Sequence, residues 1–290
     1  MTINLPQLRA FLAVVDEGGF GAAAPALGIS QSAVSHAVAA LEKAVGGPVL
    51  HRAKQPQLTT LGSRMLDHAR AAVAAASAIT DLAAEHADKP SGTIRLAAPA
   101  TVCQGLLPDL LARWRSEFPA VKVRVFEGED GEIKEWLAER TIDLAVLVNP
   151  ERHNDGVEIG ADAFYALVRR DHPLAGQEII DVTDLDDDPF LMSDGGCERF
   201  IRDIYRQAGH QVRPTHRVRE NGTLIAMVRA GVGVSVVPGL MAGSIDHRLV
   251  LVPLRQHGKR RLVLTGPDTG TWHPAVTALV DGLKTDSAAG

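Results

Sequence analysis

The chain has 290 residues, which is more than a single domain usually contains, so its length predicts two or three folded units. None of its apolar runs reaches the roughly 18 residues that a membrane span requires, and the first residues lack the basic and then apolar pattern of an export signal. We therefore expect a cytoplasmic protein with no membrane partner. Two cysteines are too few for a disulfide framework or a four-ligand zinc site, and a reducing compartment suits that count.

The formal net charge of -5 gives no support by itself to a nucleic-acid partner, because such partners usually require a basic surface. The first part of the chain is an exception, since its cations outnumber its anions up to residue 64. The cations are Arg9, Lys43, Arg52, Lys54 and Arg64, and the anions are Asp16, Glu17 and Glu42. The N-terminal segment is therefore mildly basic, and the excess of acidic residues lies in the rest of the chain.

Apolar residues recur at helical spacing from Leu5 to Ala44 and predict three short helices. The segment "DEGGFG" ends the first helix, and "LGIS" separates the second from the third. In "LGIS", Gly28 suits a left-handed turn and Ser30 suits the N-cap of the third helix. This order is typical of a helix-turn-helix, although a small helical bundle has the same periodicity.

The third helix carries short polar side chains in its first two turns, on the side away from its apolar stripe. Such side chains near the start of a recognition helix suit contacts with base edges and phosphates. The polar set is Gln31, Ser32, Ser35 and His36, and the apolar stripe is Val34, Val38 and Leu41.

The next segments predict a wing and a long helix. Residues 46–62 contain glycines, prolines, Arg52 and Lys54, which favours a two-stranded wing near phosphates, with a plain surface loop as the alternative. From Thr60 to about His86 there is no proline, and small apolar residues recur every three or four positions, which predicts one helix of roughly 40 Å. Its narrow apolar stripe favours pairing with a partner helix, and residues 87–92 then form a hinge.

From Thr93 onward, hydrophobic strands alternate with helical stretches. This alternation predicts an α/β fold with largely parallel sheets, in which ligands bind at the carboxyl ends of strands near helix N-termini. The predicted helices are Leu106–Glu117, Gly131–Arg140, Cys197–Ala208 and Leu224–Ala230.

These segments resemble LysR-type transcriptional regulators over essentially the whole chain. The motifs in the expected order are "LRAFLAVV", "LGISQSAVSHAVAALE", "VLHR" with "LTTLG", "IDLAV" and "AMVRAGVGVSVVP". The resemblance implies a multidomain α+β protein with a winged helix-turn-helix at 1–62, a linker and dimerisation helix with its hinge at 63–92, and a type 2 periplasmic-binding-protein-like α/β effector domain at 93–290.

The effector domain of this family has two subdomains joined by two crossovers. By resemblance, subdomain I covers about 93–162 and 267–290, and subdomain II covers about 163–266. The crossovers are then expected near Ala161–Phe164 and Gly266–Thr269.

The resemblance also implies partners: promoter or operator DNA, a small-molecule effector, RNA polymerase, and further copies of the chain in a homodimer or homotetramer. No cofactor, metal or catalytic residue is implied. Carried over by position, Gln31, Ser32 and Ser35 face the major groove, while Arg52 contacts phosphate or the minor groove. Family members often have proline in place of Ser32 and arginine in place of His36, so we expect affinity to depend more on Arg52 and Lys54.

The implied effector site lies between two loops. The first loop contains Thr101, Val102 and Cys103, and Thr101 occupies the position that usually contacts the effector. The second loop contains Ser193, Gly195, Gly196 and Cys197 and precedes a helix. Because two helix N-termini would then face one cleft, a small carboxylate is the first expectation for the ligand.

Three polar residues leave the ligand type open. Asp130 lies at another predicted helix start, where it is either an N-cap or a partner for an amine or hydroxyl of the ligand. Asn149 and Asn221 lie near strand ends and suit either ligand type, although asparagine is also common in plain turns.

The two cysteines allow a redox-responsive alternative, since a thiol near a helix N-terminus is more easily ionised. A disulfide requires Cα atoms within roughly 7 Å, and loops on opposite sides of a cleft are often farther apart. Apolar lining is the simpler interpretation of Cys103 and Cys197.

Two other classes of protein fit the α/β region less well. An α/β enzyme is expected to show a nucleophile elbow, a phosphate-binding loop or an H-E-x-x-H motif, and the sequence has none of these. A solute-binding protein would share the fold but would carry an export signal in place of a helix-turn-helix.

Overall fold

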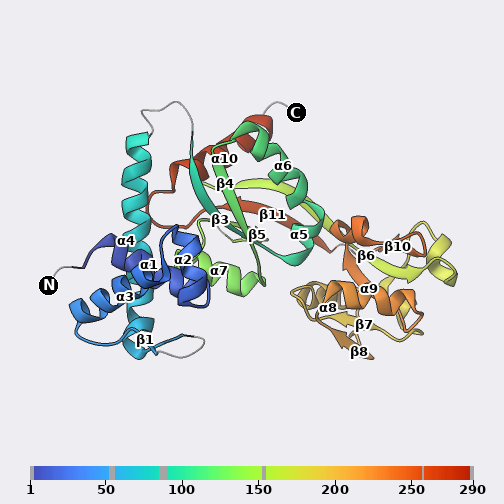
Figure 1. The fold of residues 1–290 in the computed structure, drawn as a ribbon. Coiled ribbons are helices and arrows are strands. Elements are labelled where there is room, and N and C mark those ends of the chain that lie inside the picture. Colours follow the sequence, from blue (N-terminus) through green and yellow to red (C-terminus); the bar gives the residue numbers. More distant parts are fainter. Residues whose placement is uncertain (1–2, 52–55, 85–89, 152–154, 257, 288–290) are drawn as a thin grey trace. The chain divides into compact units, whose positions relative to one another are not determined.

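The computed structural model describes residues 3–51, 56–84, 90–151, 155–256 and 258–287 (Figure 1). The chain forms two compact units. Unit 1 comprises Met1–Ser91 with Ala138–Thr141, and unit 2 comprises Gly92–Leu137 with Ile142–Gly290. In the described ranges, no helix is both long enough and apolar enough to cross a bilayer.

Unit 1 begins with three helices, α1 (Leu5–Asp16), α2 (Phe20–Leu27) and α3 (Gln31–Val45). The predicted turn chemistry is confirmed. Gly28 ends α2 with a φ of 68°, and the Ser30 side chain caps α3. The apolar faces of the three helices form one core, in which Phe11, Val34 and Leu41 are fully buried.

A two-stranded antiparallel sheet and a long helix complete unit 1. Strand β1 (Leu50–His51) pairs with β2 (Gln57–Leu58), so the wing expected at 46–62 is present as a β-ribbon. Helix α4 (Thr60–Ala84) has 25 residues. Its first half packs on the helical core through Leu61, Met65 and Leu66, while Ile79 in its second half is 68% exposed.

Unit 2 contains a sheet of seven strands, counted over the described residues, in the order β10-β6-β11-β5-β3-β4 with β9 also paired to β6. Strands β3, β4 and β5 run parallel, whereas every pairing of β6 and β11 is antiparallel. The expectation of largely parallel sheets is therefore wrong for this sheet, because β9, β10 and β11 run opposite to β3, β4, β5 and β6. The strands are β3 (Gly92–Ala98), β4 (Val121–Glu127), β5 (Leu144–Val148), β6 (Val157–Arg169), β9 (Ser235–Pro238), β10 (Leu249–Pro253) and β11 (Lys259–Thr265).

The long strand β6 connects two lobes of unit 2. Its first half pairs with β11, and its second half, from Phe164, pairs with β9 and β10. This change of partner coincides with the first expected crossover, Ala161–Phe164. The second expected crossover, Gly266–Thr269, is misplaced, because the chain returns between the end of β10 at Pro253 and the start of β11 at Lys259. Residues 266–267 come only after β11, which already belongs to the first lobe through its pairing with β5. The second segment of subdomain I therefore begins earlier than the expected residue 267.

Helices cover the sheet and place loops at the carboxyl ends of the parallel strands (Figure 1). Each of β3, β4 and β7 is followed by a helix, namely α5, α7 and α8. The helices are α5 (Ala100–Gly105), α6 (Leu107–Glu117), α7 (Asp130–Ala138), α8 (Glu198–Gln207), α9 (Asn221–Arg229) and α10 (Pro274–Ser287). Short 3-10 helices occur at η1 (Pro173–Gly176), η2 (Val182–Leu185) and η3 (Gly239–Ser244). A small parallel sheet joins β7 (Leu191–Ser193) to β8 (His216–Val218).

Candidate functional site

The polar face of α3 is exposed as its spacing predicts. Gln31, Ser32, Ser35 and His36 are all exposed, whereas Val34 and Val38 on the opposite face are buried. The Ser30 Oγ accepts a hydrogen bond from the Ala33 backbone N–H at 3.2 Å, which fixes the first turn of the helix. The helix therefore presents short polar side chains and its positive end on one surface.

Two expected DNA contacts, Arg52 and Lys54, lie outside the described residues, between β1 and β2. The strands that flank them are well defined, with Leu50 paired to Leu58 and His51 paired to Gln57. The role of both cations remains a prediction.

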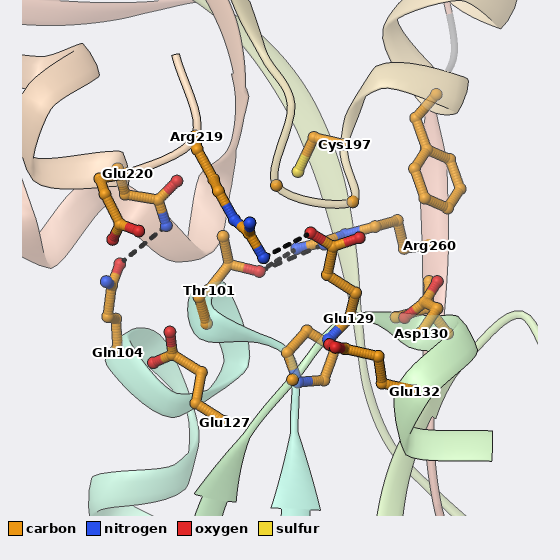
Figure 2. Close-up of a pocket in the computed structure, with 18 of the residues that line it drawn as sticks. Thr101, Gln104, Glu127, Glu129, Asp130, Glu132, Cys197, Arg219, Glu220 and Arg260 are labelled. Carbon is orange, nitrogen blue, oxygen red and sulfur yellow. Dashed lines mark hydrogen bonds and ion pairs between the residues drawn. The ribbon is translucent and has the colours of Figure 1, made fainter. Parts of the chain in front are cut away.

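Unit 2 contains a cleft of about 330 Å³ between its two lobes (Figure 2). Both loops expected to form an effector site contribute to it. The predicted residues that line the cleft are Thr101, Asp130, Gly195, Gly196, Cys197 and Asn221.

Four predicted effector residues, Val102, Cys103, Asn149 and Ser193, do not line this cleft. Val102 points into the core under the sheet, and the Cys103 thiol donates to the Ala98 carbonyl at 3.5 Å. Ser193 is buried in β7. Asn149, with a φ of 47°, accepts the Arg261 N–H at 2.7 Å and so prolongs the pairing of β5 with β11. A loop position does not decide on which side of the loop a side chain lies.

A buried arginine at the cleft wall was not predicted. Arg260 is only 2% exposed, and its Nη1 and Nη2 atoms both donate to the Thr101 hydroxyl at 3.2 Å. Its charge is compensated by Asp162 on the adjacent strand β6, and its guanidinium lies 5.4 Å from the Phe164 ring centroid. The available signal was weak, because Arg260 is the middle one of three consecutive cations at the start of the strand "KRRLVLT".

In the described residues, three polar contacts join the two lobes across the cleft. Asp130, the first residue of α7, forms an ion pair with Arg199 of α8. Glu129 lies 3.7 Å from Arg219. The Asn221 amide donates to Gln104 at 3.4 Å. Asp130 is thus an ion-pair partner of the opposite lobe, and burial raises its pKa against the lowering effect of Arg199.

The charge of the cleft differs from the expected anion site. Two guanidinium groups and five carboxylates line it, in the described part of the chain; the carboxylates are Glu127, Glu129, Asp130, Glu132 and Glu220. The start of α8 already holds its own anion, because Glu198 pairs with Arg202 and Arg217, which lowers its pKa to about 2. These contacts weaken the argument for a carboxylate ligand at that helix.

The two cysteines are unpaired, protonated thiols. Burial raises the pKa of both Cys103 and Cys197 to about 11, and the nearby Glu127 carboxylate adds to this shift at Cys103. The expected easier ionisation is therefore absent at both sites, since desolvation outweighs any helix dipole. The described ranges also contain no cluster of side chains suited to hold a metal ion.

Comparisons with known proteins match the two units. Residues 5–63 match the bacterial regulatory helix-turn-helix protein model of the lysR family, and residues 87–288 match the LysR substrate binding domain. The chain is 31% identical over 237 residues, 81% of each chain, to the uncharacterized HTH-type transcriptional regulator YvbU of Bacillus subtilis. It is 34% identical over 241 residues to a Mycobacterium leprae protein named "Probable hydrogen peroxide-inducible genes activator", covering 81% of this chain and 78% of that one.

Solved structures share the fold. A full-length OxyR variant from Pseudomonas aeruginosa has a TM-score of 0.75 at 21% identity, with 96% of this chain and 98% of that chain covered. Full-length CbnR in complex with its target DNA has a TM-score of 0.69 at 23% identity, with 97% and 99% covered. From its two matched domains and its relatives, the chain belongs to the LysR family of transcriptional regulators.

Proposed function

We propose that this regulator reads operator DNA through α3. The observation that carries the proposal is the exposed polar row of Gln31, Ser32 and Ser35 on a helix whose start is fixed by the Ser30 cap. Such side chains hydrogen-bond to base edges, while cations of the wing contact phosphate. Arg52 and Lys54 are our candidates for the phosphate contacts, and His36 extends the polar row.

In the same proposal, a small molecule in the cleft of unit 2 controls DNA binding, and the chain acts without catalysis. Pairing through α4 gives the homodimer or homotetramer, because exposed apolar residues such as Ile79 favour a partner helix. RNA polymerase is the further partner through which operator binding changes transcription.

A gel-shift titration with the DNA upstream of the protein's own coding region tests the assignment of α3. We expect Gln31→Ala to weaken operator binding about 5- to 150-fold, equivalent to about 1–3 kcal/mol, and to leave binding to random DNA nearly unchanged. Arg52→Ala should weaken both. Gln177→Ala, the same exchange at an exposed position of unit 2, serves as the control. Equal losses on operator and random DNA for Gln31→Ala would remove it from base reading.

A second candidate, response to hydrogen peroxide, is favoured by the named function of the Mycobacterium leprae relative and by the position of Cys197 in the cleft wall. In this scheme the Cys197 thiol reacts with one peroxide to give a sulfenic acid and water, and condensation with the Cys103 thiol releases a second water and forms a disulfide. The raised pKa of each thiol opposes the first step. If peroxide leaves DNA binding unchanged in the parent and in Cys103→Ser and Cys197→Ser, the candidate is rejected.

A further inference from the structure

The acidic lining of the cleft in unit 2 is only partly compensated. Asp130 pairs with Arg199, and Glu129 pairs loosely with Arg219. The side-chain carboxylates of Glu127 and Glu220, in contrast, have no hydrogen-bond or ion-pair partner in the described part of the chain. Two uncompensated carboxylates therefore line the cleft.

These two carboxylates come from opposite lobes. Glu127 ends strand β4 of one lobe, and Glu220 lies directly before α9 of the other. Figure 2 shows both on the side of the cleft where Gln104 lies, apart from the Arg260 side. A charged group bound between them contacts both lobes at once.

The opposite wall supplies hydrogen-bond donors without net positive charge. Arg260 lines the cleft and is 2% exposed, and the Asp162 carboxylate cancels its charge. Its buried Nε–H has no partner in the described residues. The Thr101 hydroxyl accepts both Arg260 hydrogen bonds, so its own O–H remains as a donor for a ligand oxygen.

Electrostatics then discriminates between ligand classes. An anion would face at least two uncompensated carboxylates, Glu127 and Glu220, which repel it. A cationic nitrogen meets the same carboxylates favourably. The volume of about 330 Å³ is at the small end for ligand pockets, which favours a small molecule.

We propose that the cleft binds a small organic amine that also carries an oxygen acceptor. Its ammonium group lies between Glu127 and Glu220, and its oxygen lies at Thr101 and Arg260. This inference rests on the proposed function in taking the cleft as the effector site, and it replaces the carboxylate expected from the sequence.

Thermal unfolding of the full chain tests this ligand class. The probes are linear amino alcohols of two to six carbons, each paired with the hydroxycarboxylate of the same chain length, at equal ionic strength. All three tryptophans, Trp114, Trp136 and Trp272, lie in unit 2, so their fluorescence reports the unfolding of that unit. At about ten times the Kd, an amino alcohol should raise the unfolding midpoint by about 3 °C.

Variants show whether the effect comes from the cleft. The shift should vanish in the double variant Glu127→Gln/Glu220→Gln and persist in Glu178→Gln, an exposed carboxylate that does not line the cleft. The proposal is overturned if no amino alcohol raises the midpoint, if the hydroxycarboxylates raise it as much, or if the double variant responds like the parent.

The same preparation separates this proposal from the proposed function. Operator binding by the parent without any probe is measured in parallel by gel shift. Stabilisation by amino alcohols without operator binding rejects the regulatory function alone. Operator binding without amine selectivity rejects the ligand class alone.

Discussion

Replacement of Arg260 by methionine is expected to destabilise unit 2 strongly. The Arg260 and Asp162 side chains are 3% and 6% exposed, so the variant leaves a buried carboxylate without its cation. It also removes both hydrogen bonds to the Thr101 hydroxyl and the contact with the Phe164 ring. Breaking a buried pair by removing one partner costs about 3–5 kcal/mol.

Urea unfolding followed by tryptophan fluorescence measures this loss, because all three tryptophans lie in unit 2. The expected loss corresponds to a fall in the thermal midpoint of about 10 °C for a unit of this size. Arg206→Met is the matched control. The Arg206 and Asp203 side chains that form this ion pair are 75% and 54% exposed. Exposed ion pairs contribute about 0–1 kcal/mol to the free energy of unfolding.

A second substitution separates two contributions to this loss: the lost attraction between the two side chains and the cost of burying the unpaired Asp162 carboxylate. If the penalty comes mainly from the unpaired carboxylate, Arg260→Met with Asp162→Val recovers most of the stability, since apolar replacements of buried pairs are often neutral. A loss in Arg260→Met no larger than that in Arg206→Met would refute the reasoning. A double variant less stable than Arg260→Met would refute it as well.

Two further predictions concern a glycine in unit 1 and the thiols of unit 2. Gly62→Ala should destabilise unit 1 by about 2 kcal/mol or more, because the new Cβ would lie 2.0 Å from the Val49 carbonyl oxygen. Gly21→Ala in α2 is the control: its Cβ would lie in open space, so the variant should be more stable by about 0.5–1 kcal/mol. Thermal unfolding followed by circular dichroism measures the stability of both variants. Equal changes in stability in the two variants would contradict the predicted clash with Val49. Cys103 and Cys197 should react with iodoacetamide at pH 7.5 far more slowly in the native chain than in urea, because their pKa values are about 11. Since the folded pKa is raised, the stability that the protonated thiols contribute should be present below about pH 9 and lost between about pH 9 and 11. Mass spectrometry and unfolding at each pH test these expectations, which fail if native labelling is fast or stability is flat over that range.

Local signals predicted the DNA-binding unit well. A helix cap, a left-handed glycine and an apolar stripe act within one or two turns, so Ser30, Gly28 and Val34 carry the information for their own segment. The polar row on α3 follows from the same periodicity. For the same reason the long helix α4 and the alternation of strands and helices in unit 2 were predictable.

The cleft depends on the tertiary structure, because its walls come from segments far apart in the chain. Asp162 and Arg260 are 98 residues apart, and only the antiparallel pairing of β6 with β11 makes them neighbours. Sequence reasoning placed Thr101 and Cys197 at the cleft but could not decide that Cys103 points elsewhere.

The sequence by itself determined the family, the exposed polar row of α3 and the two loops that line the cleft of unit 2, because each depends on short-range patterns. Only the tertiary structure decided which charges face the cleft and which are already compensated. Electrostatic balance is a property of distances between side chains, and strand order sets those distances. Glu127 and Glu220 became candidate ligand contacts for that reason, on a surface where the sequence had favoured an anion.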